Sequence, residues 1–221
     1  MDQFPIDIIL LALIAGFVAL RLRSVLGRRT GHEPGRDAGA GGDGALKPSP
    51  ASPVEPEAPA SLPPVDIAPD SALGKTLSRL QLVDRAFEPA TFLAGAQRAY
   101  EMIIQAFAEG DEEALRPLVS REVMERFSAA IKERRNAGET VETKVVDVTS
   151  AKIVEAALSE RTAEITVRFV SELLTVTRNA AGEIIAGNPS DTEKTIDLWT
   201  FARDIRDRDP NWTLVATAVG D

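Results

Sequence analysis

The feature that most restricts the fold of this chain is a change in the spacing of its apolar residues at Gly138. Upstream of it, one set of apolar residues recurs every three or four positions: Phe92, Ala96, Tyr100, Ile103 and Phe107. This spacing is typical of a helix with one buried face. Downstream, segments rich in Val, Ile and Thr alternate apolar with polar residues, as strands do. Helices followed by consecutive strands predict an α+β domain whose helices cover one face of a twisted, curved antiparallel sheet.

Turn and cap residues divide the helical part into three segments. We expect the first helix to end at Gly110, and a short second helix to begin after Asp111 and to break at Pro117. Ser120 is the expected N-cap of a third helix, which ends at Gly138. The inward face of the third helix carries Val123, Met124, Phe127 and Ile131.

The second half of the domain predicts strands separated by short turns. Turn residues occur at 179–182, 187–190 and 207–210. The strands are expected over 140–149, 151–158, 161–177, 193–203 and 212–218.

An apolar run precedes the domain and is followed by arginines. Phe4–Leu20 is apolar apart from Asp7, which places it at the short end of the range for a bilayer-spanning helix. Acidic residues before the run and basic ones after it favour an uncleaved single-pass anchor with a cytoplasmic C-terminal domain. A helix lying in the membrane interface, a cleaved signal and a buried helix are the alternatives. The candidate anchor residues are Phe4, Ile8, Leu11, Ile14, Phe17, Leu20, Arg21, Arg23, Arg28 and Arg29.

Composition then divides the chain into four parts. Residues 1–29 form the anchor, and its basic cluster at Arg21–Arg29 suits anionic lipid head groups. Residues 30–71 hold nine of the fourteen prolines and a glycine cluster, which predicts a disordered tether. Residues 72–90 form an amphipathic lead-in segment that docks on the domain, on a partner or on the membrane. Residues 91–221 form the α+β domain.

Charge and cysteine content exclude several classes of function. The net charge is −9, which argues against nucleic-acid binding because phosphate contacts need a concentrated basic face. The chain has no cysteine, so it has no disulfides and no thiolate nucleophile. The one histidine, His32, lies in the predicted tether and is a poor candidate for catalysis.

Several stretches resemble a known family. They are FLAGAQRAYEMIIQAFAEGDEEALRPLVSREVMERF, VRFVSELLTVTRNAAGEIIAGNP, DLWTFARD and NWTLVAT, together with the N-terminal IDIILLALIAGFVALRLRSVLGRRTG. This combination resembles the TimA family, the bacterial relatives of the peripheral scaffold subunit (subunit 44) of the mitochondrial inner-membrane presequence translocase. The resemblance implies a cone-shaped fold like that of nuclear transport factor 2. It also implies a bacterial inner-membrane protein that acts as an adaptor for protein partners.

The residues that could carry chemistry are few. Asp197 and Glu172 are the candidates for an acid or base, and neither has an evident partner in the sequence. Asp204, Asp207 and Asp209 cluster but lack the spacing of a calcium loop, so a solvated turn with Arg203, Arg206 and Arg208 as local counter-charges is the preferred interpretation. We therefore expect no enzymatic activity, no cofactor and no metal.

Seven aromatic residues are candidates for lining a pocket in the cone. If they do, the domain binds an apolar peptide, an acyl chain or another small molecule; otherwise they fill the core. This gives two hypotheses, a membrane-anchored adaptor for unidentified proteins and a lipid- or small-molecule-binding domain. The seven residues are Tyr100, Phe107, Phe127, Phe169, Trp199, Phe201 and Trp212.

Overall fold

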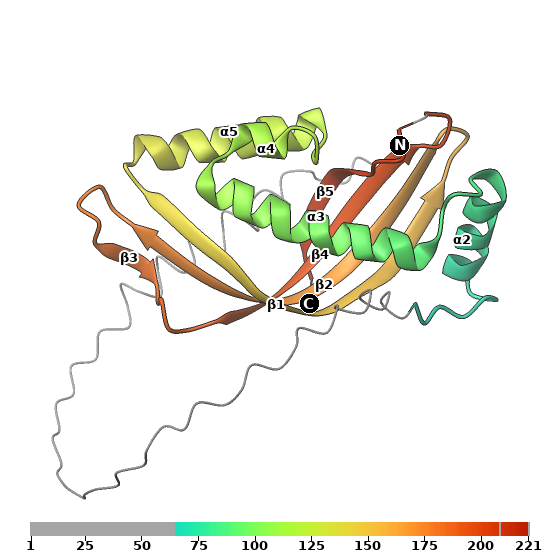
Figure 1. Ribbon diagram of the computed structural model, residues 1–221, viewed down its shortest axis with the longest axis horizontal. Helices are drawn as coiled ribbons and strands as arrows, with labels where there is room; N and C mark the ends of the chain where they lie inside the picture. The colour runs from blue at the N-terminus through green and yellow to red at the C-terminus, as the bar shows by residue number, and fades with distance from the viewer. Residues whose placement is uncertain (1–64, 208, 221) are drawn as a thin grey trace, which may run out of the picture.

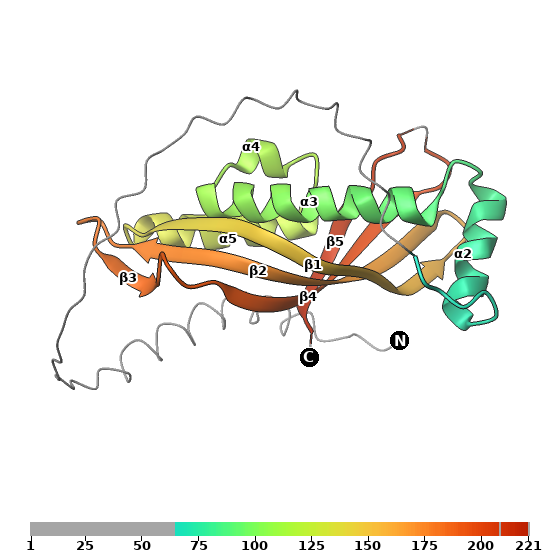
Figure 2. The ribbon, with the colours of Figure 1, turned by 60° about the horizontal axis from the view of Figure 1, so that its bottom comes forward.

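A long helix, α3 (Pro89–Glu109), lies across one face of an antiparallel sheet, as the computed structural model shows for residues 65–207 and 209–220 (Figure 1). Helices α4 (Glu112–Leu115) and α5 (Arg121–Asn136) lie on the same side, as the turned view shows (Figure 2). The predicted α+β fold is therefore confirmed. The remaining elements are α2 (Ala72–Val83), β1 (Thr140–Leu158), β2 (Thr162–Arg178), β3 (Ile184–Gly187), β4 (Glu193–Asp204) and β5 (Thr213–Val219).

The predicted anchor (1–29), His32 and most of the predicted tether (30–71) lie outside the described residues. Within the described part of the chain, no helix combines the length and the apolar character that a membrane crossing requires.

The predicted caps are confirmed by their hydrogen bonds. Gly110 ends α3 with a left-handed backbone (φ 71°), which glycine adopts without steric cost. The Asp111 carboxylate accepts bonds from the first backbone N–H groups of α4, and the Ser120 hydroxyl accepts one from Val123 at the start of α5.

The C-terminal end of α3 is also held by arginines from α5. Arg134 donates to the carbonyl oxygens of Phe107 (2.9 Å) and Ala108 (2.8 Å), and Arg135 donates to that of Gly110 (2.7 Å). The Phe107 carbonyl also accepts from the Gly110 N–H, and positive charge is favourable beside the last carbonyls of a helix. Together with the contact between the Phe107 and Phe127 rings, these hydrogen bonds join α3 to α5.

The strands follow the order β1-β2-β4-β5, and β3 pairs with β2. Two strands predicted over 140–149 and 151–158 are one strand, β1, so the predicted break was wrong. The pairing with β2 shifts register between Val145 and Asp147, between Val148 and Ser150, and between Ile153 and Glu155. Such β-bulges bend a strand without ending it, which is how a single chain segment follows the curved sheet.

The core lies between α3 and the concave face of the sheet. The α3 stripe of Phe92, Ala96, Tyr100 and Ile103 is buried there, as its spacing predicts. The alternating residues of β2 meet it from the other side, and they are Ala163, Ile165, Val167 and Phe169.

The lead-in segment belongs to the same core. Leu77 and Leu80 of α2 and the following Phe87 are buried in it, so this segment docks on the domain itself. Val65 and Ile67, within the segment predicted to be tether, also pack against the core and are partly buried. The folded unit thus begins well before Phe92.

Candidate functional site

The seven aromatic residues predicted as pocket candidates pack mainly against one another and their neighbours. Five are buried, whereas Phe107 and Trp212 are partly buried. The Tyr100 ring stacks on Phe169 with centroids 4.4 Å apart, and Phe107 meets Phe127 at 4.7 Å. The buried five are Tyr100, Phe127, Phe169, Trp199 and Phe201.

A polar cluster lies inside this aromatic core and joins α3 to the sheet. The Tyr100 hydroxyl donates to the Asp197 carboxylate at 2.7 Å and lies 2.7 Å from the Ser171 hydroxyl. The Ser171 hydroxyl is in turn 2.9 Å from that of Thr195. Tyr100 and Ser171 are fully buried, so each of their polar groups needs a partner within the protein.

Burial sets the protonation behaviour of this polar cluster. It raises the pKa of the Tyr100 phenol well above its usual value, and the nearby negative charge of Asp197 adds to the effect. Burial also raises the pKa of Asp197, while the hydrogen bond from Tyr100 opposes that shift. Tyr100 therefore remains a hydrogen-bond donor at neutral pH, and Asp197 remains its acceptor.

The structure places the two candidate acids, Asp197 and Glu172, in different surroundings. Asp197 accepts a hydrogen bond from Tyr100 in the core, a partner that the sequence did not reveal. Glu172 follows Ser171 on β2, so its side chain points to the opposite face of the strand. The structure therefore does not bring the two acids together.

A second buried polar contact fixes α2 to the end of the sheet. Asp84, at the C-terminal cap of α2, forms an ion pair with Arg203 of β4, and each side chain is 11% exposed. The Arg203 guanidinium also lies over the Trp212 ring, 5.4 Å from its centroid, and donates to the Pro210 carbonyl at 3.3 Å. The prediction that Arg203 balances the neighbouring acidic turn is wrong, because its carboxylate partner comes from α2.

The acidic turn itself is held by hydrogen bonds to its own backbone. Asp204 accepts from the N–H of Arg206, Asp207 from that of Asp209, and Asp209 from that of Asn211. Arg161 adds an ion pair to Asp204 at 2.7 Å. Among the described residues, no group of three His, Asp or Glu side chains is placed to hold a metal ion.

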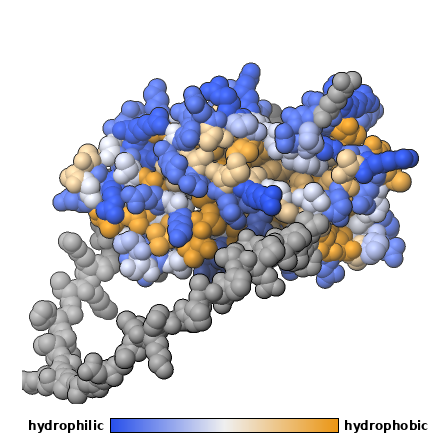
Figure 3. All heavy atoms as spheres, in the orientation of Figure 1, coloured by the Kyte–Doolittle hydropathy of each residue, from blue (hydrophilic) through white to orange (hydrophobic). Residues whose placement is uncertain are grey.

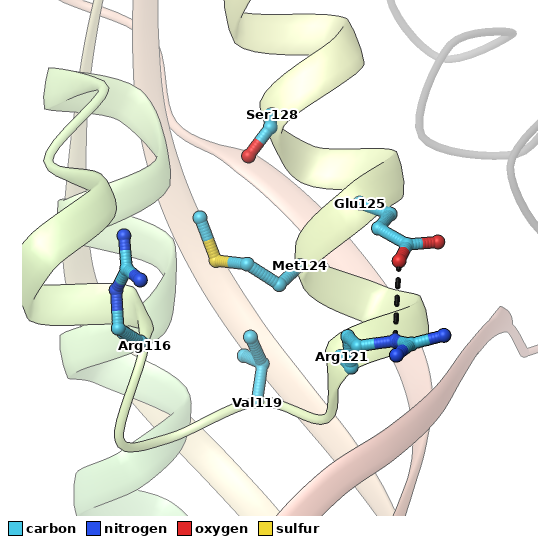
Figure 4. A pocket seen from close by; sticks show the side chains of 6 residues that line it. All are labelled: Arg116, Val119, Arg121, Met124, Glu125 and Ser128. Atoms are coloured by element: carbon cyan, nitrogen blue, oxygen red, sulfur yellow. Dashed lines mark ion pairs between the residues drawn. The ribbon is translucent and has the colours of Figure 1, made fainter.

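Two open cavities lie outside the aromatic core. The larger, about 480 Å³, lies beside α5 (Figure 4). Its floor includes Val119 and Met124, and Arg121 at its rim forms an ion pair with Glu125 at 3.3 Å. The second, about 310 Å³, is beside the acidic turn. None of the seven aromatic residues lines either cavity, so the apolar-pocket hypothesis remains a prediction.

The surface exposes apolar side chains in small groups. On the face shown in Figure 3, hydrophilic residues separate the hydrophobic ones. Leu82 and Val83, at the end of α2, are 80% and 57% exposed. Val146 and Val154 project from β1 and are 47% and 43% exposed.

Known proteins similar to this chain include mitochondrial translocase subunits. A probable import inner membrane translocase subunit, tin-44 of Caenorhabditis elegans, is 20% identical over 140 residues, which are 62% of this chain and 33% of that protein. The human import inner membrane translocase subunit TIM44 is 19% identical over 139 residues, 62% of this chain and 31% of that protein. The chain thus spans about a third of the length of these relatives.

Solved structures with a related arrangement are more distant. The intermembrane space region of the chloroplast protein ARC6 has 10% sequence identity and a TM-score of 0.37, over 57% of this chain and 95% of that one. An NTF2-like protein of unknown function from Rhodospirillum rubrum has 16% identity and a TM-score of 0.31, over 57% of this chain and 98% of that one.

A family model covers almost all of the folded unit. The model described as Tim44-like domain matches residues 73–219, a range that begins in α2 and ends with β5. It therefore includes the lead-in helix, the aromatic core and both buried polar contacts. The chain belongs to the family of proteins with a Tim44-like domain.

Proposed function

We propose that this protein is a membrane-tethered adaptor that binds protein partners at the cytoplasmic face of a bacterial inner membrane. The observation that carries the proposal is the Tim44-like domain over residues 73–219, because the similar proteins are named as subunits of an inner-membrane translocase. Within that family, we assign the chain to the TimA group on the sequence stretches that resemble it. The partners themselves are unidentified proteins.

The architecture of the chain supports the tether. The apolar run Phe4–Leu20 and the arginines that end at Arg29 are separated from the described folded unit by 35 residues, 30–64. The tether predicted for this segment would have an average span of roughly 35 Å, and its prolines would extend it further. The domain would therefore sample a zone near one membrane face, where Arg21–Arg29 would contact anionic lipids.

The packing of the domain favours a binding role over catalysis. Of the two candidate acids, Asp197 is hydrogen-bonded to Tyr100 between helix and sheet. We accordingly propose that the domain is not an enzyme. The lipid- or small-molecule-binding alternative would need an apolar ligand to enter the aromatic core or to occupy the cavity beside α5.

Proximity labelling tests the adaptor role directly. Three fusions carry a promiscuous biotin ligase at the C-terminus: the full chain, a chain lacking residues 2–29, and residues 1–71 alone. We expect the full chain to label a set of proteins that residues 1–71 alone do not label, because the folded domain recruits them. The chain lacking residues 2–29 should be recovered from the soluble fraction, and its labelling of membrane proteins should fall.

Two results would contradict the proposal. Identical labelling by the full chain and by residues 1–71 would mean that the domain recruits no protein. A periplasmic reporter fused after Asp221 that is active would reverse the predicted orientation.

A further inference from the structure

Within the described part of the chain, no second strand pairs with the outer edge of β1, although α3 and α2 contact this strand. β1 pairs with β2 on one side, and within the described part of the chain its side-chain hydrogen bonds and ion pairs also lead to β2. The opposite edge is partly covered, because β5 exchanges backbone hydrogen bonds with the loop before α5. Leu214 donates to the Leu118 carbonyl at 2.9 Å and accepts from Ser120 at 2.8 Å.

An open strand edge has unpaired N–H and C=O groups that a second strand can complete. β1 presents such an edge over 19 residues, which is longer than most strands in globular proteins. Its outward side chains show what kind of strand would fit.

The charges of β1 are arranged symmetrically about its centre, between Thr149 and Ser150. When the strand is paired antiparallel with a copy of itself about this point, Lys144 lies opposite Glu155 and Asp147 lies opposite Lys152. Opposite charges directly across a strand pair are favourable, and two-fold symmetry makes each pair occur twice. All four side chains are exposed in the single chain.

The burial pattern of β1 is symmetric about the same centre at most positions, although the exposed Val146 faces the buried Ile153. The partly buried Val148 faces the partly buried Ala151, and Thr143 similarly faces Ala156. The bulge between Val145 and Asp147 falls close to the bulge between Ile153 and Glu155 of the copy. The third bulge, between Val148 and Ser150, lies at the centre of symmetry and therefore falls close to its own counterpart in the copy.

We infer that two copies of this chain associate through β1, pairing antiparallel with Lys144 opposite Glu155 so that the two sheets become one. In this register Val146 lies opposite Ile153 of the copy, and Val154 lies opposite Val145. The interface is isologous, so it closes after two copies and does not propagate into a fibre. This inference does not depend on the adaptor role proposed above.

Charge reversal tests the register. The mass of the full chain in detergent micelles is followed by native mass spectrometry over a concentration series. Lys144→Glu places like charges opposite each other twice, and we expect the dimer dissociation constant to rise about tenfold or more. The double variant Lys144→Glu with Glu155→Lys restores opposite charges and should recover the wild-type dissociation constant.

A matched control has the same change of net charge away from the strand. Lys132→Glu lies on an exposed position of α5 and should leave the dissociation constant unchanged. A monomer at every concentration would overturn the inference. So would equal weakening by the single and the double variant, since the proposed register requires rescue.

Disulfide trapping in native membranes provides a second test, because the chain has no cysteine of its own. In the variant Asp147→Cys with Lys152→Cys, the two positions of one copy are about 16 Å apart along the strand, which is too far for a disulfide. A disulfide must therefore join two copies. We expect a covalent dimer on a non-reducing gel from this double variant.

The two single-cysteine variants are its controls. Asp147→Cys alone and Lys152→Cys alone should run as monomers on the same gel. In each of them the cysteine faces a side chain that cannot form a disulfide. Absence of a dimer from the double variant, or equal amounts from the single variants, would contradict the proposed pairing.

Discussion

At the scale of single residues, the two buried polar contacts have different effects on stability. Tyr100 and Asp197 join α3 to the sheet, whereas Asp84 and Arg203 join α2 to it. Both contacts surround a carboxylate with protein, yet only the second supplies an opposite charge. A carboxylate that is buried beside a neutral donor costs free energy when it ionises.

The free energy of unfolding should therefore depend on pH through the ionisation of Asp197. The pKa of Asp197 is raised above its ordinary value near 3.8, so its favourable contribution is present below that pH and is lost as the pH rises through the folded-state value. Asp197→Asn keeps an acceptor for Tyr100 but cannot ionise. We expect the stability of this variant relative to wild type to increase between pH 4 and pH 7, as measured by urea unfolding.

Asp204 provides the control with the opposite sign. Its hydrogen bonds with Arg206 and Arg161 lower its pKa below 3.8, so its contribution is lost only at more acidic pH. The difference between Asp204→Asn and wild type should accordingly stay constant from pH 5 to pH 7. If the difference in unfolding free energy between Asp197→Asn and wild type also stayed constant with pH, the proposed effect of burial on the pKa of Asp197 would be wrong.

Removal of one partner of the Asp84–Arg203 pair should be costly. Asp84→Ala leaves the guanidinium beneath the surface without its counter-ion, and such losses amount to about 3 kcal/mol of unfolding free energy. Arg121→Ala is the comparison, because its ion pair with Glu125 is exposed (91% and 67%) and contributes less than about 1 kcal/mol. Denaturant midpoints measure both, and equal losses would contradict a structural role for the buried pair.

At the scale of elements, the β2–β3 hairpin depends on two glycines that are not equivalent. Gly182 (φ 80°) and Gly187 (φ 78°) both have left-handed backbones. A Cβ on Gly187 would overlap the Thr175 carbonyl of β2, whereas a Cβ on Gly182 would meet open space. Both substitutions carry the cost of a side chain in this conformation, roughly 1–2 kcal/mol, but only one adds a collision with backbone.

We therefore expect Gly187→Ala to open β3 and Gly182→Ala to leave it closed. Hydrogen exchange of the β3 amide groups is the measurement, because local opening need not change the global unfolding transition. Gly187→Ala should exchange these amides faster than Gly182→Ala does. Slower exchange in Gly187→Ala than in Gly182→Ala would show that the steric overlap at Gly187 is relieved at little cost.

At the scale of the whole molecule, the lead-in helix decides where the folded unit begins. Leu77, Leu80 and Phe87 are 4%, 1% and 5% exposed, and each contributes about 1.5–3 kcal/mol through burial. Their sum is comparable with the total stability of an ordinary domain, which is about 5–15 kcal/mol.

A chain that begins at residue 65 should therefore unfold cooperatively, whereas one that begins at residue 91 should be strongly destabilised. Thermal unfolding followed by circular dichroism compares the two chains. Equal melting temperatures would mean that α2 is an appendage and that the core is complete without it.

The sequence by itself determined the features that depend on neighbouring residues. The spacing of Phe92, Ala96, Tyr100 and Ile103 predicted α3 and its buried face, and Gly110 predicted its end. Alternation along β2 predicted which side chains enter the core. These features were predictable because helix and strand periods, caps and turns are local properties of the chain.

Only the tertiary structure decided the features that join distant residues. Asp197 meets Tyr100, 97 positions away, and Asp84 meets Arg203 across nearly the whole domain. The bulges that let β1 continue through Ser150, and the short strand β3, follow from pairing with β2. Local patterns do not specify such contacts, because which segments meet is set by the packing of all the helices and strands at once.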